Sequence, residues 1–391
     1  MAAPERELDL LDGDFYAGDP DPTYRWLRTH APVYRDRTNQ LWGISRYDDI
    51  VHVERHPELF CSGRGFRPNF PGDASMIGQD DPRHLLQRRL FNSSLTPRKV
   101  LDLEPLVRET VTGLLDAFAD RGECDVVRDV AIPLPVMLVI RLIGFDVEAW
   151  PVFAEIAETT NAAGGGPRYL NESVMKAVLL WRERIHALIG SRRDERRTDA
   201  TSAMLDAHEA RRVERSDDDM AMEALLLLNG GSDTTRHVIG GATLALLEHP
   251  EQLELLRREP ERIPVAVEEF IRWVTPILNM RRTATRDTEI AGIPIAEGEE
   301  VLMMFSSANR DETRFTDPDR FDVTRDPNPH LSFGLGTHFC LGASLARLEL
   351  RVVFEEMLRR LEDLRRATEG PLPYVRNAFV RGLEALPVRF R

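Results

Sequence analysis

The chain has few cysteines and no long apolar run, and each shortage excludes a class of protein. Its 391 residues contain three cysteines, Cys61, Cys124 and Cys340. An odd and sparse set is not a disulfide framework and fits a reducing compartment. The most apolar stretch, residues 131–144, holds two prolines and Arg141 and is too short to span a bilayer. Neither a disulfide-rich secreted protein nor a transmembrane segment is expected.

Basic side chains are outnumbered by acidic ones, 51 to 65. The net charge is −14 at pH 7, whereas a protein that binds nucleic acid usually presents a basic surface. Nucleic acid is therefore not the expected partner. The first residues, Met-Ala-Ala-Pro-Glu-Arg-Glu-Leu-Asp, lack the apolar core of a secretory signal peptide. We expect a cytoplasmic protein.

The chain has no linker, repeat or low-complexity tract, so a single large domain over residues 1–391 is expected, mainly α with a smaller β portion. The expected β-rich segments are about 33–46, 282–305 and 375–390. The expected helical core spans about 82–274 and 340–361. Within this core, apolar periodicity predicts helices at 98–120, 134–143, 147–162, 170–195, 251–258 and 262–274. Pro82 should open another helix. The longest helix should start at a Ser216–Asp219 capping pair and end at Pro250.

The string from Phe333 to Gly342, Phe-Gly-Leu-Gly-Thr-His-Phe-Cys-Leu-Gly, is the most informative in the chain. Its first two glycines allow a tight turn and a close approach to a large flat ligand. Cys340 precedes a helix expected to begin at Leu341, and a helix N-terminus stabilises a thiolate and lowers its pKa. The pattern indicates a cysteine that holds a metal. A glycine turn with a buried structural cysteine is the alternative.

A second unusual string, Gly230-Gly231-Ser232-Asp233-Thr234-Thr235, lies inside the longest predicted helix. Two adjacent glycines cost a helix about 2 kcal/mol relative to alanine. They could mark a bend or a close helix crossing. They could also form a notch over a flat cofactor, in which Thr234 offers a hydroxyl and Asp233 relays protons.

Together these strings resemble those of the cytochrome P450 monooxygenases, and the resemblance extends from about residue 14 to residue 388. It implies the P450 fold and a haem b cofactor, iron protoporphyrin IX, with Cys340 as the iron ligand. It also implies catalytic roles for Asp233 and Thr234 in supplying the protons that cleave the O–O bond of molecular oxygen. The lack of a membrane anchor favours a bacterial member of the family.

The same resemblance gives roles to further residues. Glu269 and Arg272 would form a buried structural network with Arg320, and this network would hold the cysteine loop. Without that context a Glu-x-x-Arg pair would be an ordinary surface ion pair. Phe333 and Gly334 would also contact the haem. The haem propionates would be bound by four cationic or donor side chains, those of His84, Arg88, Arg282 and His338.

The candidate substrate-pocket residues come from segments that vary most between P450s, and most are apolar, which favours a large hydrophobic substrate. They are Phe66, Phe70, Met76, Ile77, Asn161, Leu227, Gly230, Val274, Ile277, Leu278, Asn279, Met280, Phe379 and Val380. Some of these are expected to be core residues instead.

Several strings, among them Asn279-Met-Arg-Arg and Asn377-Ala-Phe-Val-Arg-Gly-Leu-Glu, are similar to actinobacterial P450s that hydroxylate the terminal methyl of cholesterol or cholest-4-en-3-one. A sterol side chain is therefore the expected substrate. The alternative is tailoring hydroxylation of a terpenoid, polyketide or fatty acid. A haem-thiolate sensor or isomerase would be a different class of protein. The Asp233–Thr234 pair favours a monooxygenase, because a sensor or an isomerase needs no proton relay.

The chain has no flavin or nicotinamide module. Gly334-x-Gly336 is not a dinucleotide fingerprint, because Phe339 occupies the third glycine position. The resemblance implies that electrons from NAD(P)H arrive through a ferredoxin reductase and a ferredoxin. Candidates for a basic docking patch are Arg89, Arg98, Lys99, Arg347 and Arg351. Ordinary solvated charges are the competing interpretation.

Overall fold

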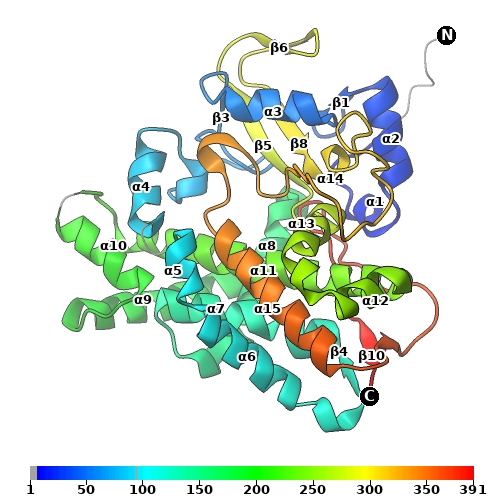
Figure 1. Ribbon diagram of the computed structural model, residues 1–391. Coiled ribbons are helices and arrows are strands. Elements are labelled where there is room, and N and C mark those ends of the chain that lie inside the picture. The colour runs from blue at the N-terminus through cyan, green and yellow to red at the C-terminus, as the bar shows by residue number, and fades with distance from the viewer. Residues whose placement is uncertain (1–6, 93–94, 211) are drawn as a thin grey trace.

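The computed structural model describes residues 7–92, 95–210 and 212–391. Helices dominate, and a smaller β-rich part that includes the N-terminal segment lies at one end of the molecule (Figure 1). This confirms the predicted mainly α architecture with a smaller β portion. Most of the N-terminal stretch that lacks a signal-peptide core, residues 1–9, lies outside the described residues. Within those residues, no helix has the length and apolar character needed to cross a bilayer.

The helices of the larger part follow one another along the chain. They are α4 (Arg83–Asn92), α5 (Pro97–Leu101), α6 (Glu104–Asp116), α7 (Pro133–Ile143), α8 (Trp150–Ala162), α9 (Glu172–Asp194), α10 (Ala200–Glu209), α11 (Asp217–Glu248), α12 (Pro250–Arg258), α13 (Ile263–Val274) and α15 (Ala343–Arg360). The other α-helices of the described residues belong to the β-rich part: α1 (Gly13–Ala17), α2 (Asp21–His30), α3 (Tyr47–Arg55) and α14 (Phe305–Ala308).

Helix α11 occupies the centre of the helical part and packs against α7, α8, α13 and α15 (Figure 1). Its start is the predicted one. The Ser216 hydroxyl accepts from the backbone N–H of Asp219, and the Asp219 carboxylate accepts from the N–H of Ser216, which satisfies two backbone donors of the first turn. Pro250 then opens α12, as expected for a residue that cannot continue a helix.

The largest sheet has the strand order β1-β2-β8-β5-β3. Its strands are β1 (Val33–Asp36), β2 (Leu41–Ile44), β3 (Phe60–Cys61), β5 (Asn279–Ala284) and β8 (Glu300–Met304). The first two form the predicted hairpin, β2 runs parallel to β8, and β5 runs antiparallel to β8. Two smaller sheets are made of β4 (Glu123–Asp125), β10 (Pro387–Arg389) and β9 (Arg365–Arg366), and of β6 (Thr288–Ile290) and β7 (Ile293–Ile295).

Three details differ from the sequence prediction. The helix expected over 98–120 is two helices, α5 and α6, because Pro105 at the start of α6 cannot donate to the preceding turn. Helix α15 begins at Ala343, two residues after the expected Leu341. Within 375–390 the regular strand is limited to β10, and the rest is held by isolated bridges such as Ile277 with Val380.

Candidate functional site

The cysteine loop is closed by its own backbone. The N–H of Cys340 donates to the carbonyl of Phe333 at 2.8 Å, so the chain leaves and returns at one point. Gly334 and Gly336 both have φ of 64°, a left-handed conformation that favours glycine. The Arg347 guanidinium lies 4.6 Å from the ring centroid of Phe333 and fixes the base of the loop. The two glycines are therefore required by the loop geometry, as the sequence predicted.

Cys340 is unpaired, and so are Cys61 and Cys124. Burial raises the pKa of the Cys340 thiol, while the N–H groups of Gly342 and Ala343 and the charge of Arg88 oppose that rise. The sequence predicted that the helix N-terminus would lower the pKa of Cys340. The effect of burial is larger, so the pKa rises instead. A metal cation bound to Cys340 would supply the missing stabilisation, because a coordinating thiol is deprotonated outright.

The four predicted propionate ligands come together beside this loop. The rings of His84 and His338 have centroids 4.1 Å apart, and Arg88 donates to the carbonyl of Phe339. The pKa of His338 is lowered to about 2, first by burial and then by the charges of Arg282, His84 and Arg88. This group of nearby cations and donors suits an anionic ligand.

One donor in this group is left without a partner. Nδ1 of His84 contacts the Asp81 carboxylate at 3.1 Å, whereas its Nε2 is buried and has no hydrogen-bond partner among the described residues. A buried polar atom without a partner carries a desolvation cost of about 1–3 kcal/mol. An anionic group bound here would remove that cost.

Arg282 itself has an acidic partner that sequence reasoning missed. Its Nη2 lies 3.1 Å from Oε1 of Glu54, a buried residue of α3. The other carboxylate oxygen, Oε2, accepts from the N–H of Leu335 at 2.6 Å. Glu54 thereby joins Arg282 to the cysteine loop.

The glycine pair of α11 has two distinct local environments. A Cβ on Gly231 would lie 2.8 Å from a methyl of Val139, so this glycine permits close packing of α11 on α7. A Cβ on Gly230 would meet no atom of the described residues within 4 Å, so this glycine faces open space. The hydroxyl of Thr234 donates to the carbonyl of Gly230 at 3.0 Å. Gly231 therefore forms the close helix crossing, whereas a notch over a cofactor at Gly230 stays a prediction.

Asp233 is held by side chains from two helices. It is 4% exposed, and its Oδ2 accepts from Nδ2 of Asn161 in α8 at 2.7 Å. Arg236 lies 3.5 Å from the other oxygen and also pairs with Glu158 at 3.1 Å. Burial raises the pKa of Asp233, and Arg236 and Asn161 oppose the rise. Asn161, predicted only as a pocket residue, thus orients the predicted catalytic acid.

A second buried acid lies between α11 and α15. Glu349 of α15 is 2% exposed and bonded to the side chain of Thr235. Burial raises the pKa of Glu349 to about 8, and within the described part of the chain its Oε2 has no hydrogen-bond partner. This contact ties the helix that follows Cys340 to the helix that carries Asp233 and Thr234.

Glu269 and Arg272 form the predicted network, with one correction. Both side chains are fully buried, and two bonds of 2.7 Å join them in bidentate geometry. The third member is Arg325, whose Nε lies 3.2 Å from Oε2 of Glu269. Arg320, the predicted member, is exposed and contributes its backbone carbonyl to Arg272. A turn from Asp322 to Arg325 reverses the chain and brings Arg325, not Arg320, back to Glu269.

This network reaches the cysteine loop through Asn309. Arg272 Nη1 donates to the carbonyl of Asn309 at 2.8 Å. The Asn309 side chain accepts from the N–H of Leu331 at 2.7 Å and donates to Ser332 at 2.8 Å. The segment that enters the loop is therefore fixed to the buried ion pair.

Two predicted pocket residues, Asn279 and Phe379, meet at Arg67, which lies in the long loop over residues 61–79. Its Nη1 and Nη2 donate to the backbone and side-chain oxygens of Asn279, at 2.7 and 3.0 Å. Its guanidinium lies 3.9 Å from the ring centroid of Phe379, and its Nε donates to the carbonyl of Gly164. Burial lowers the pKa of Arg67 to about 9. The long loop, β5, the C-terminal segment and the glycine break after α8 are thus joined at one buried cation.

Other pocket candidates have different surroundings. Leu278 is 1% exposed and packs with Leu10 and Met304 in a core cluster, so it is a core residue instead of the predicted pocket residue. Met76 is also buried, and its N–H donates to Glu223 of α11. For the remaining residues of the set, a role in lining the pocket stays a prediction.

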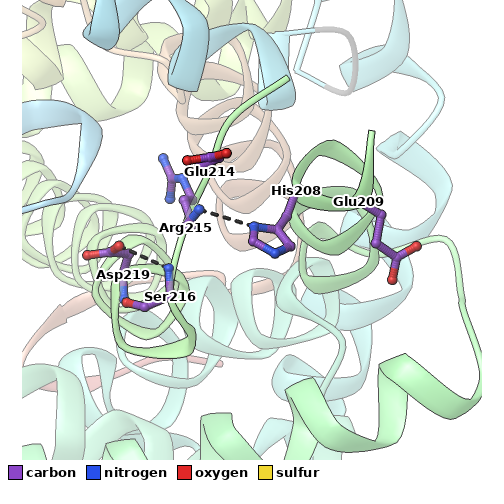
Figure 2. A pocket seen from close by; sticks show the side chains of 6 residues that line it. All are labelled: His208, Glu209, Glu214, Arg215, Ser216 and Asp219. Carbon is purple, nitrogen blue, oxygen red and sulfur yellow. Dashed lines mark hydrogen bonds between the residues drawn. The ribbon is translucent and has the colours of Figure 1, made fainter. Parts of the chain in front are cut away.

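A polar pocket of about 520 Å³ opens between the end of α10 and the start of α11 (Figure 2). Its lining consists of His208, Glu209, Glu214, Arg215, Ser216 and Asp219. The N–H of Arg215 donates to Nδ1 of His208 at 3.2 Å. No residue of this lining is a predicted site residue, and the described part of the chain holds no group of three or more His, Cys, Asp or Glu side chains suited to a metal ion.

Comparison with known proteins agrees with this geometry. The family profile "Cytochrome P450" matches residues 176–382. Steroid C26-monooxygenase of Mycobacterium tuberculosis is 42% identical over 388 residues, which cover 98% of this chain and 97% of that protein. Steroid C26-monooxygenase of Mycolicibacterium smegmatis is 41% identical over 390 residues, covering 98% and 96%. The crystal structure of CYP109E1 from Bacillus megaterium in complex with testosterone has a TM-score of 0.90 and 30% identity, covering 97% of this chain and 99% of that one.

The chain belongs to the cytochrome P450 family. It is a monooxygenase with the P450 fold and a haem b cofactor, which confirms the family, fold and cofactor that the sequence predicted. The residues of the site fit that cofactor. In the part of the chain that the structure describes, the buried Nε2 of His84 lacks a partner, and Cβ atoms on Gly230 and Gly342 would meet no atom within 4 Å.

Proposed function

We propose that this P450 hydroxylates the terminal methyl of a sterol side chain, with cholest-4-en-3-one or cholesterol as the substrate class. This substrate assignment rests on the similarity, over nearly the whole length, to two proteins named Steroid C26-monooxygenase. The apolar character of most predicted pocket residues supports a large hydrophobic substrate.

The chain's own residues are assigned as follows. Cys340 binds the haem iron, Phe333 and Gly334 contact the haem, and the cations and donors beside the loop hold its propionates. That group consists of His84, Arg88, Arg282 and His338. Haem, when bound, supplies the iron that activates molecular oxygen with two electrons and two protons.

Proton supply falls to α11. Burial raises the pKa of Asp233, which favours the protonated form of its carboxyl group, and Asn161 and Arg236 fix the direction of that carboxyl. The Thr234 hydroxyl, beside the open face of Gly230, passes the proton to the reacting oxygen. Packing around the long loop keeps bulk water away from the substrate.

Electrons come from NAD(P)H through a ferredoxin reductase and a ferredoxin in this proposal. Two predicted docking cations are already paired, Arg347 with Glu268 at 2.7 Å and Arg351 with Glu104. Arg89 and Arg98 have no acidic partner within 4.0 Å in the described chain, and Lys99 has one contact, at 3.9 Å from Asp102. These three residues of α4 and α5 are the docking cations that we retain.

We also propose a cytoplasmic location. The three unpaired cysteines fit a reducing compartment.

The test of the substrate is an optical titration of the purified ferric protein with cholest-4-en-3-one. We expect the Soret band to move to the high-spin position as the sterol displaces water from the iron, and turnover with a ferredoxin system to yield the terminal hydroxyl. A steroid with the same rings but no side chain is the matched control and should give no such product. A Soret shift with a branched fatty acid but none with the sterol would overturn the sterol assignment and favour the tailoring class.

A further inference from the structure

Glu54 is a buried acid that contacts a group of basic side chains beside the cysteine loop. It lies on α3, is 7% exposed as a residue, and its side chain is 3% exposed. Acidic side chains are rarely buried unless they are paired. Neither the sequence motifs nor the proposed proton supply uses it.

The contacts of Glu54 reach two parts of the candidate haem site. Its Oε1 lies 3.1 Å from Nη2 of Arg282, while Nη1 of the same arginine donates to the carbonyl of Arg281 at 3.0 Å. Its Oε2 accepts from the N–H of Leu335 at 2.6 Å, inside the cysteine loop. One carboxylate thus orients the guanidinium of Arg282 and fixes the backbone of the loop.

The loop backbone is packed directly on this residue. A Cβ on Gly336 would lie 2.7 Å from the carbonyl oxygen of Glu54, and a Cβ on Gly334 would lie 3.2 Å from its Oε2. Any side chain at Gly336 would collide with α3. The glycines that shape the loop therefore also allow Glu54 to approach it.

The charges around Glu54 make it exceptional. Burial lowers the pKa of His338, and the charges of Arg282, His84 and Arg88 lower it further, so these basic groups lie close to one another. Asp81, the other carboxylate in contact with this group, is about half exposed and therefore screened by solvent. Burial raises the pKa of Glu54, and Arg282 and the Leu335 N–H oppose the rise. A contact with a guanidinium, which is always charged in proteins, favours the ionised carboxylate.

We propose that Glu54 is a positioning residue that holds Arg282 against the cysteine loop and that its fixed negative charge lowers the reduction potential of the haem. The inference rests on the proposed haem site. Reduction of ferric to ferrous iron adds one electron, so a nearby negative charge disfavours the reduced state. Burial makes the effect larger than it would be in water, and hydrogen bonding and burial are known means of tuning haem potentials.

The experiment is a dye-coupled redox titration of the substrate-free holoenzyme and its Glu54→Gln variant. Glutamine keeps the size and an oxygen that can accept from Leu335, but it removes the charge. We expect the ratio of reduced to oxidised haem at a fixed potential to rise about tenfold, which corresponds to 59 mV for a one-electron couple. Glu54→Asp retains the charge and should keep the ratio near that of the wild type, and a tenfold rise in this variant as well would show that altered packing, not lost charge, is the cause.

The matched control is Glu223→Gln. Glu223 is fully buried and lies 3.1 Å from Arg215, so it reproduces the burial and the ion pair of Glu54, but on α11 and in contact with Met76. Its substitution should leave the ratio unchanged. An unchanged ratio in Glu54→Gln, or an equal rise in Glu223→Gln, would overturn the inference. A wild-type protein without a thiolate-ligated haem spectrum would instead overturn the proposed site, so the two failures are distinguishable.

Discussion

Replacement of Arg325 tests the corrected membership of the buried network. Arg325 Nε lies 3.2 Å from the fully buried Glu269, and its Nη atoms donate to the carbonyls of Thr316, Asp317 and Arg320. Its side chain is 11% exposed. Arg325→Met keeps most of the apolar stem but removes the charge and these donors. Arg320→Met is the matched control, because the side chain of Arg320 is exposed and its contribution is a backbone carbonyl.

The magnitude follows from what Glu269 retains. Arg272, the side chain of Asn328 and the N–H of Asp322 still donate to it in the Arg325 variant. The loss is therefore smaller than that of a whole buried pair, and we expect about 2–4 kcal/mol. With an unfolding entropy of about 2.1 cal/mol/K per residue over 391 residues, each kcal/mol lowers Tm by about 1.2 °C. Arg325→Met should then lower Tm by about 2.5–5 °C.

The assay is thermal unfolding of the holoenzyme, followed by far-UV circular dichroism and by loss of the haem Soret band. Arg320→Met should stay within about 0.5 kcal/mol of the wild type, as exposed substitutions usually do. Equal destabilisation by the two variants, or a greater effect of Arg320→Met, would refute the assignment of Arg325 to the network.

Three further predictions concern the proton path and the buried acids. Thr234→Ala should continue to consume NADPH and release peroxide with little hydroxylated sterol, because its hydroxyl no longer delivers protons; product formed in step with NADPH would contradict the role. Asn161→Leu removes the 2.7 Å bond to Asp233, so the solvent isotope effect on kcat should increase several-fold, and an unchanged isotope effect would show that Asn161 does not orient the acid. The pKa of Glu349 is raised from 4.5 to about 8 by burial, so its stabilising contribution is complete below about pH 4.5 and is lost as the pH rises through about 8. The Tm of the wild type should therefore fall relative to Glu349→Gln over this range, and parallel Tm curves for the two proteins would refute the shift.

Local signals predicted much of the fold correctly. The Ser216–Asp219 capping pair marks the start of α11 because both of its hydrogen bonds form within one turn. The hairpin over 33–46 follows from alternation within a few residues. Helix α10 was missed, although Asp199 caps it by accepting from the N–H of Ser202. That capping signal was present in the sequence but lay in a strongly charged stretch.

The site was less accessible to sequence reasoning where partners are distant in the chain. Asn161 and Asp233 are 72 positions apart, and Glu54 and Arg282 are 228 apart. No local period encodes such contacts. Arg320 and Arg325 illustrate the same limit at short range, because both are arginines in one segment and the intervening turn alone decides which of them reaches Glu269.

The central claim is that Cys340 ligates the haem iron as a thiolate, and one spectrum tests it most directly. The reduced, carbon monoxide-bound wild type should show the red-shifted Soret band that a thiolate ligand gives, and Cys124→Ala, which removes a buried and unpaired cysteine outside the candidate site, should keep it. Cys340→Ala should lose that band. A thiolate-type band that persists in Cys340→Ala would contradict the account.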